Sequence, residues 1–356
     1  MAKGKIMDRS ATATYDFETG VYRPPSEGGS NSLLVRLTRN CPWNRCTFCG
    51  MYKTEKFQVR SVAEIKQDID AMAAVRDDLV AASQRSGRDG EISHQSAMAL
   101  IGKHPELNHH PGFAMLYHWL LAGGQTVFLQ DANSLIMNTG QLVAVLEYLR
   151  RTFPSIVSIT TYARSKTIVQ KSLTDLKAIR RAGLDRLHVG LESGDDTVLR
   201  NVHKGATAEI HINGGRKALA AGFQLSEYWM PGLGGKTLWE QHARNTARVL
   251  SQINPHYIRS RPFRAWPGTP MAREAAEQAF EMLTPAQQLR ELRLTMQALS
   301  VTGRVCFDHA GNYWKNRRGG LLFTHSYEGY QFPQEKQTVL DLIDDGLAAG
   351  NRHPHR

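Results

Sequence analysis

Three of the four cysteines fall within nine positions, as Cys41, Cys46 and Cys49, in the spacing C-x4-C-x2-C. They follow the apolar run at residues 33–37. Three thiolates on one short loop can hold three irons of a [4Fe–4S] cube. The fourth iron would then have no protein ligand and could bind a small molecule. The spacing therefore predicts a metal centre held at the end of a buried strand.

Two other interpretations of these cysteines stay open, structural zinc and structural or redox-active thiols. A structural zinc site takes four ligands, and the remaining cysteine, Cys306, is far along the chain. A C-x2-C pair in a chain with few cysteines is more often metal-binding than disulfide-bonded. The open-iron cluster is therefore favoured over both alternatives.

Composition points to a globular protein of a reducing compartment. Apolar residues make up 41% and charged residues 22% of the 356 positions, as in ordinary globular domains. No run of 18 apolar residues exists, and the basic N-terminus lacks an apolar core, so we expect neither a membrane span nor a secretory signal. With few cysteines, a cytoplasmic location is expected. The net charge of +11 favours an anionic substrate or a polyanionic partner, although the protein could simply be basic.

The chain begins with an irregular lead-in, residues 1–32, and a first strand is expected at 33–38. Ser61 and Glu64 have the spacing of a capping box and predict the start of a helix. Residues 77–123 do not fit a strand–helix repeat and are interpreted as a helical insertion. The histidine-bearing stretch 104–112 within it lacks a recognisable ligand spacing and is expected to be a solvated loop.

From residue 124 onward, strand and helix patterns alternate, which predicts a parallel sheet. With the first strand there are six β/α units. We expect strands at 126–130, 156–163, 186–192, 224–230 and 257–261, and helices at 139–151, 173–182, 206–221, 237–251 and 285–301.

The cysteine loop resembles the cluster loop of the radical S-adenosylmethionine (SAM) superfamily, with four residues rather than the commoner three in its first gap. Residues 190–194, Gly-Leu-Glu-Ser-Gly, and residues 267–270, Pro-Gly-Thr-Pro, resemble the branch that includes the elongator-type enzymes, the methylthiotransferases and anaerobic coproporphyrinogen oxidase. This resemblance implies an α/β fold, a partial (β/α)6 barrel over 33–301. A second three-cysteine set is missing, so a methylthiotransferase is not expected.

The resemblance also implies an oxygen-sensitive enzyme with two cofactors, one [4Fe–4S] cluster and S-adenosylmethionine. Reductive cleavage would give a 5′-deoxyadenosyl radical that abstracts hydrogen from a substrate, with electrons from a donor such as flavodoxin or ferredoxin. The metal ligands would be Cys41, Cys46 and Cys49. The cofactor-binding candidates, at the strand ends and beside the last cysteine, are Phe48, Asp131, Asn133, Ser134, Glu192, Ser193, Gly232, Gly234 and Gly235.

Asp131 is expected to bind the cofactor ammonium, as the carboxylate in its turn, and Glu192 to accept hydrogen bonds from the ribose. Arg200 and Lys204 are expected to be surface or helix-entry charges.

Arginines mark the expected substrate side. Arg259 and Arg261 are two apart, so on a strand they point the same way, and Arg264 follows. Guanidinium groups suit carboxylates and phosphates, so a small anionic substrate is expected. The extension 302–356 is expected to cap the barrel, with Cys306 buried. The candidates for catalytic residues are Arg164, Arg261, Arg264 and His309.

The reaction class, whether oxidoreductase, lyase or transferase, stays open. The alternatives are a non-catalytic cluster or haem carrier with the same fold, and a basic RNA-binding protein with structural zinc. tRNA is a less favoured partner than a small molecule.

Overall fold

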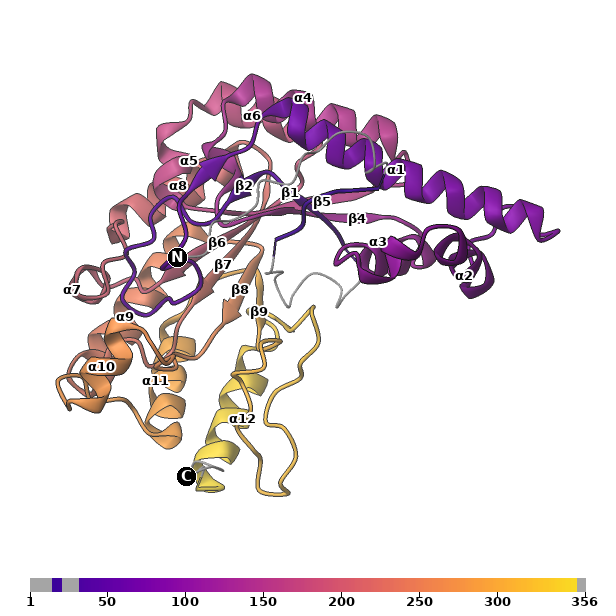
Figure 1. Ribbon diagram of the computed structural model, residues 1–356. Coiled ribbons are helices and arrows are strands. Elements are labelled where there is room, and N and C mark those ends of the chain that lie inside the picture. The colour runs from indigo at the N-terminus through magenta and orange to yellow at the C-terminus, as the bar shows by residue number, and fades with distance from the viewer. Residues whose placement is uncertain (1–14, 21–31, 351–356) are drawn as a thin grey trace, which may run out of the picture.

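The computed structural model describes residues 15–20 and 32–350, and one open, mostly parallel sheet lies at its centre (Figure 1). Seven of the eight strands are parallel to their neighbours, and the last is antiparallel. In spatial order the strands are β1 (Leu33–Arg36), β4 (Thr126–Gln130), β5 (Ser158–Ala163), β6 (Arg186–Glu192), β7 (Gln224–Trp229), β8 (Tyr257–Ser260), β9 (Arg304–Cys306) and β10 (Tyr330–Gln331).

All six expected strands are present, and helices separate them along the chain as the alternation predicts. The fold class, an α/β barrel of the partial type, is confirmed. The helices are α1 (Val62–Arg85), α2 (His94–Lys103), η1 (Pro105–His109), α3 (Phe113–Leu121), η2 (Ser134–Ile136), α4 (Thr139–Thr152), α5 (Ser165–Gln170), α6 (Leu173–Arg181), α7 (Asp196–Asn201), α8 (Ala208–Ala220), α9 (Gly235–Ile253), α10 (Pro270–Ala276), α11 (Pro285–Ala298) and α12 (Lys336–Ala348).

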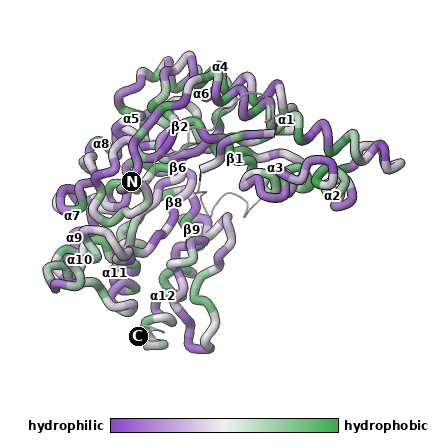
Figure 2. Tube along the Cα trace, viewed as in Figure 1, coloured by the Kyte–Doolittle hydropathy of each residue, from purple (hydrophilic) through white to green (hydrophobic). Residues whose placement is uncertain are grey.

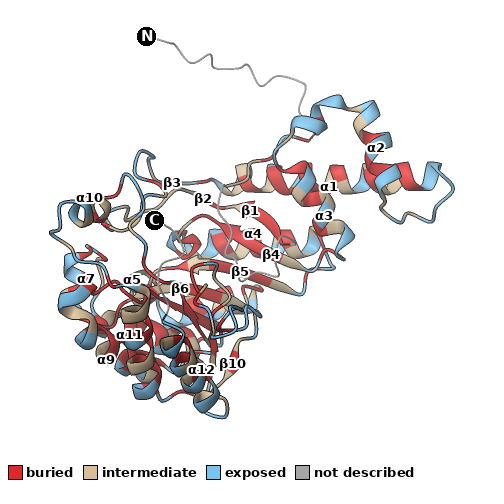
Figure 3. Ribbon diagram, turned by 90° about the horizontal axis from the view of Figure 1, so that it is seen from below, coloured by how far each residue is buried: buried red, intermediate tan, exposed pale blue. Residues whose placement is uncertain are grey.

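The two faces of the sheet carry different side chains, because successive residues of a strand point to opposite faces. Val127 and Leu129 of β4 belong to the large core that the sheet forms with the helices. Phe128, between them, is also buried, but its ring meets that of Tyr162 at 5.1 Å between centroids. Figure 3 shows the strands as a buried centre with exposed helix surfaces around them.

The expected helical insertion consists of α2, η1 and α3, which lie with the far end of α1 beyond the β1 edge of the sheet (Figure 1). α1 begins at the predicted capping box, in which Ser61 and Glu64 cap each other's backbone. Along α1 and α4 hydrophilic and hydrophobic residues alternate (Figure 2), and the buried residues of α1 include Ile65, Ile69 and Met72 at helical spacing.

The C-terminal extension adds to the sheet, which the sequence did not predict. β9 pairs in parallel with β8, β10 pairs with β9, and α12 packs against α11. Three residues are too few to show a strand periodicity, so β9 escaped the pattern.

Of the expected lead-in, residues 1–14 and 21–31 lie outside the described part. In the described part no helix is both long enough and apolar enough to cross a membrane.

Candidate functional site

The cysteine loop, residues 40–57, leaves β2 (Thr38–Arg39) and ends at β3 (Gln58–Val59), its antiparallel partner. Its start follows the carboxyl end of β1, which is the end of the sheet where ligands bind in parallel α/β folds. Cys41, Cys46 and Cys49 are free thiols of intermediate exposure. The backbone N–H of Asn44 donates to Cys41 Sγ at 3.4 Å.

The three thiols of this loop are not arranged around a single metal ion in the described structure. Among the residues that the structure describes, no group of three or more His, Cys, Asp or Glu side chains is placed to hold one metal ion. One zinc ion would bring its sulfur ligands to about 3.8 Å from each other, given Zn–S bonds of about 2.3 Å. A cube needs wider spacing, since each thiolate binds a different iron.

The cysteine loop is seated on the connection between β6 and α8. Trp43 Nε1 donates to the carbonyl of His203 at 2.7 Å, and Thr47 N donates to the carbonyl of Val202 at 3.1 Å. A Cβ built at Gly205 would lie 2.3 Å from the Trp43 ring, so only glycine allows this approach. The loop is therefore positioned by residues about 160 positions further along the chain.

Glu192, at the end of β6, forms an ion pair with Lys204, whose Nζ lies 3.0 Å from Glu192 Oε1. Lys204 is 9% exposed, so the expectation of a surface charge was wrong for Lys204, whereas Arg200 is exposed as expected. Lys204 follows α7 in the segment that contacts the cysteine loop through Val202 and His203. Burial raises the pKa of the Cys46 thiol, and the positive charge of Lys204 opposes that rise.

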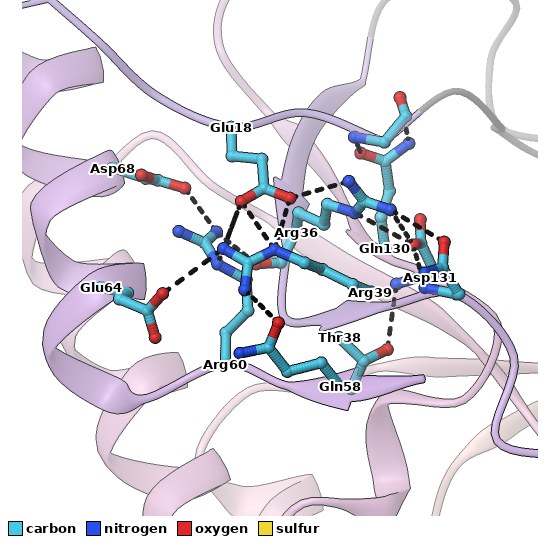
Figure 4. Close-up of polar contacts among 12 residues, drawn as sticks. Glu18, Arg36, Thr38, Arg39, Gln58, Arg60, Glu64, Asp68, Gln130 and Asp131 are labelled. Carbon is cyan, nitrogen blue, oxygen red and sulfur yellow. Dashed lines mark hydrogen bonds and ion pairs between the residues drawn. The ribbon is translucent and has the colours of Figure 1, made fainter. Parts of the chain in front are cut away.

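Asp131 lies in a network of charges at the start of the cysteine loop (Figure 4). Its Oδ2 accepts from Arg36 Nη2 at 2.7 Å and from the backbone N–H of Asn40 at 2.8 Å. Its Oδ1 is buried and has no hydrogen-bond partner. One oxygen of Asp131 thus anchors the loop, and the other is a buried acceptor without a partner, with Gly20 so close that a Cβ built there would lie 2.3 Å from it.

Glu18 of the lead-in holds the other side of this network (Figure 4). It accepts from Arg36 at 2.7 Å and from Arg39 at 2.6 Å, and Arg60 lies 3.6 Å away. Arg60 in turn pairs with Asp68 of α1 at 2.5 Å. Arg39 directly precedes the cysteine loop and Arg60 directly follows β3, so Glu18 contacts the chain at both ends of the loop.

Three further cofactor candidates have polar partners within the protein. Asn133 accepts from the backbone N–H of Arg164 at 3.2 Å, and Ser134 Oγ lies 2.8 Å from Thr161 Oγ1. Ser193 Oγ lies 2.8 Å from His242 Nδ1. We interpret these contacts as bracing the strand-end turns. Phe48 packs beside a small apolar cluster that includes Val198, Met230 and Met271.

Glu291 of α11 binds the backbone of the glycine turn, residues 232–235, which follows β7. Gly232 N donates to the two carboxyl oxygens of Glu291 at 3.1 and 3.0 Å, and His242 Nε2 lies 3.2 Å from Glu291 Oε1. Burial raises the pKa of Glu291 to about 8 and lowers that of His242 to about 4. Gly232 has a φ of 89°, a conformation that favours glycine.

The arginines on the expected substrate side differ in their surroundings. Arg259 is fully buried and pairs with Asp308 of the extension at 2.9 Å. Arg261 is partly exposed, and its side chain has no hydrogen-bond or ion-pair partner among the described residues. Arg264 is exposed over the Tyr313 ring, 4.5 Å from its centroid. Burial, together with the charges of Arg261 and Arg264, lowers the pKa of His309 to about 4.

An open cavity of about 800 Å³ lies elsewhere, between α7, the start of α9 and the segment after α10. Gly234 and Gly235 belong to its wall, but the three cysteines, Asp131 and Glu192 do not. Its wall also includes Val202 and His203, whose carbonyls hold the cysteine loop, so the cavity adjoins the segment on which that loop rests.

Sequence reasoning missed Lys204, Glu291, Asp308 and Glu18. Their partners lie well outside any local motif: Lys204 pairs with Glu192, 12 positions away, and Glu291 binds Gly232, 59 positions away. No local motif signals such a pairing. The burial of Cys306, by contrast, was predicted and is confirmed at 0% exposure.

Comparison with known proteins identifies the fold. Residues 123–247 match the family model described as the Radical SAM superfamily. The matched segment runs from just before β4 into α9. The cysteine loop lies outside the matched segment. Members of this superfamily are enzymes that bind a [4Fe–4S] cluster and S-adenosylmethionine and need an electron donor and a substrate.

Solved structures similar to this chain include coproporphyrinogen III oxidase (HemN) from Escherichia coli, at 17% identity and a TM-score of 0.46, covering 77% of this chain and 54% of that one. Methylornithine synthase (PylB) is 15% identical, with a TM-score of 0.44 and coverage of 77% and 65%. Elp3 from the archaeon Methanocaldococcus infernus is 11% identical, with a TM-score of 0.42 and coverage of 62% and 53%. The chain thus spans less than two thirds of each. No curated protein matches it.

Proposed function

We propose that this protein is a single-cluster radical SAM enzyme in which Cys41, Cys46 and Cys49 hold the cluster and an anionic small molecule is the substrate. The observation that carries the first part is the cysteine loop, with three free and partly exposed thiols at the carboxyl end of a parallel sheet. Bound there, the two cofactors would supply a 5′-deoxyadenosyl radical, and that chemistry is their own.

The residues of the chain would bind and orient the cofactor. The free Oδ1 of Asp131 is suited to accept from the cofactor ammonium, and Glu192, held by Lys204, to accept from the ribose hydroxyls. The turn at Gly232 lets the backbone approach the cofactor closely. Phe48 supplies an apolar surface beside the last cysteine.

The anionic substrate is supported by the guanidinium of Arg261, which has no hydrogen-bond or ion-pair partner in the described part of the chain. A partly buried arginine without a carboxylate partner is poised to form charge-assisted hydrogen bonds to a ligand. Arg264 adds a second positive charge. His309 is neutral near pH 7 and its Nδ1 accepts from Gly311 N–H at 2.9 Å, so its Nε2–H can donate a hydrogen bond to an anionic substrate. The extension that carries His309 also supplies Asp308 to Arg259, which joins the extension to the sheet.

The cluster is tested by anaerobic reconstitution with iron and sulfide analysis, a visible spectrum and a dithionite-driven assay for 5′-deoxyadenosine. Cys41→Ala, Cys46→Ala and Cys49→Ala should each lose the chromophore and the cleavage, since too few thiolates remain. Cys306→Ala is the matched control and should keep both. A wild-type protein that binds zinc but no iron, or that holds a cluster without cleaving the cofactor, would refute the proposal.

The substrate class is tested with citrate and pyrophosphate as probes, measured by calorimetry on the reconstituted protein. A double variant, Arg261→Ala with Arg264→Ala, should weaken the binding of at least one probe and leave 5′-deoxyadenosine formation intact. Arg317→Ala with Arg318→Ala, on an exposed loop, is the control for net charge. Equal binding in both double variants contradicts an anionic site at these arginines. If the affinity for the probes fell steeply with rising salt concentration in both variants, the attraction would be nonspecific, as expected for a polyanion such as tRNA.

A further inference from the structure

Arg164 follows β5 at its carboxyl end, and its side chain faces the cysteine loop. Its guanidinium carbon lies 4.8 Å from the centroid of the Trp43 ring. Its Nη2 donates to the carbonyl of Lys204 at 2.8 Å. Trp43 itself stands between Cys41 and Cys46 in the sequence. Arg164 thus contacts both the loop and the segment on which the loop rests.

Arg164 has no carboxylate partner among the described residues, unlike Arg36 and Arg259 of the sheet. Arg36 pairs with Asp131, and Arg259 with Asp308. Taking an unpaired charge out of water is costly unless an opposite charge is nearby. The groups that oppose the effect of burial on the pKa of Arg164, and raise it, are the thiols of Cys46 and Cys41.

A cluster held by three thiolates is net negative, and one added electron makes it more so. The reduction potential of an iron–sulfur cluster depends on nearby charge, on hydrogen bonds to its sulfurs and on exposure. A fixed positive charge beside the loop stabilises the reduced state more than the oxidised state. The guanidinium is partly buried, so solvent and salt screen it less than an exposed charge.

We propose, on the basis of the proposed function, that Arg164 is a positioning residue that acts as the counter-charge of the cluster, holding Trp43 in place and raising the reduction potential. Its partner is therefore the cysteine loop rather than the substrate. The electron comes from an external one-electron donor, and Arg164 changes only how favourable that transfer is.

The test is a redox titration of the reconstituted cluster, followed by electron paramagnetic resonance, in the absence of S-adenosylmethionine. Arg164→Met removes the charge and keeps an apolar side chain over Trp43. A nearby charge commonly shifts a pKa by about one unit or more. By analogy, we expect the ratio of reduced to oxidised cluster at a given potential to fall about tenfold, a shift of about 59 mV for one electron.

Arg45→Met is the matched control, since Arg45 also lies over Trp43, at 5.2 Å, but is exposed. Arg45→Met should shift the reduction potential much less than Arg164→Met. Arg164→Lys keeps the charge and should stay near the wild-type potential. If Arg164→Met holds no cluster, retention of the cluster by Arg164→Lys supports the counter-charge, and loss in both overturns it.

An unchanged potential in Arg164→Met, with weaker binding of S-adenosylmethionine by calorimetry, would also overturn the proposal, because Arg164 would then bind the cofactor directly. Failure of the proposed function has a different signature, since the wild-type protein would then take up no [4Fe–4S] cluster at all.

Discussion

Glu291 carries a prediction about pH that can be worked out from its surroundings. The side chain is 1% exposed and lies under the glycine turn. With its pKa raised to about 8 and that of His242 lowered to about 4, both by burial, the pair is uncharged near pH 7. Although the two groups are only 3.2 Å apart, we assign a neutral pair rather than an ion pair, because full burial disfavours both charges.

The sign follows from proton linkage. Between pH 4.5, the ordinary value for Glu, and about 8, folded Glu291 binds a proton that the unfolded chain has released. The free energy of unfolding therefore falls as pH rises through this range. For His242 the folded pKa is the lower one, so its contribution rises with pH between about 4 and 6.5 and is constant above that. Above pH 6.5, therefore, only Glu291 of this pair still changes the free energy of unfolding with pH.

One pKa unit corresponds to about 1.36 kcal/mol. From pH 6 to pH 8, allowing for the onset of ionisation near the folded pKa, Glu291 should cost the protein about 2 kcal/mol of stability. Glu291→Gln keeps an acceptor for the N–H of Gly232 and cannot ionise, so this loss should vanish in the variant.

The assay is urea unfolding of the reduced apo-protein at pH 6, 7 and 8. Wild-type protein should lose about 2 kcal/mol more than Glu291→Gln over this range. Glu240→Gln, at an exposed position of α9, is the control and should follow the wild type. If wild type and Glu291→Gln keep a constant difference at all three pH values, the carboxyl group does not titrate as argued and the neutral pair is wrong.

Three further outcomes follow from other contacts. Glu18→Gln weakens ion pairs to three arginines and should lower the free energy of unfolding by about 1–2 kcal/mol in urea; an unchanged value would mean that the network adds no stability. Asp308→Ala leaves a buried arginine unpaired and should cost about 3–5 kcal/mol by the same measurement, whereas a cost below about 1 kcal/mol would show that water or another group replaces the carboxylate. Gly205→Ala meets Trp43 at 2.3 Å and should lower the iron content after reconstitution, whereas Gly268→Ala, which has a similar φ and open space around it, should not; equal iron contents would contradict the seating of the loop.

Local features of the fold were predictable from sequence. The strand and helix alternation follows from hydrophobic periodicity, and the capping box at Ser61 is a matter of four consecutive residues. The cysteine loop is visible for the same reason, since its three thiols are close in the chain. β9 is the exception among the parallel strands, because its three residues are too few to show the alternation of a strand.

Partnerships across the strand ends were decided by the tertiary structure alone. Asp131 binds Arg36 from 95 positions away, and Trp43 binds the carbonyl of His203 from 160 positions away. Neither pairing has a local signature, because it depends on which strands become neighbours in the sheet. Lys204 shows the consequence: in the sequence it reads as a surface charge, and folding buries it between Glu192 and the cysteine loop, where its charge acts on Cys46. Residue types are local information, whereas the electrostatic environment of each one exists only after the sheet has assembled.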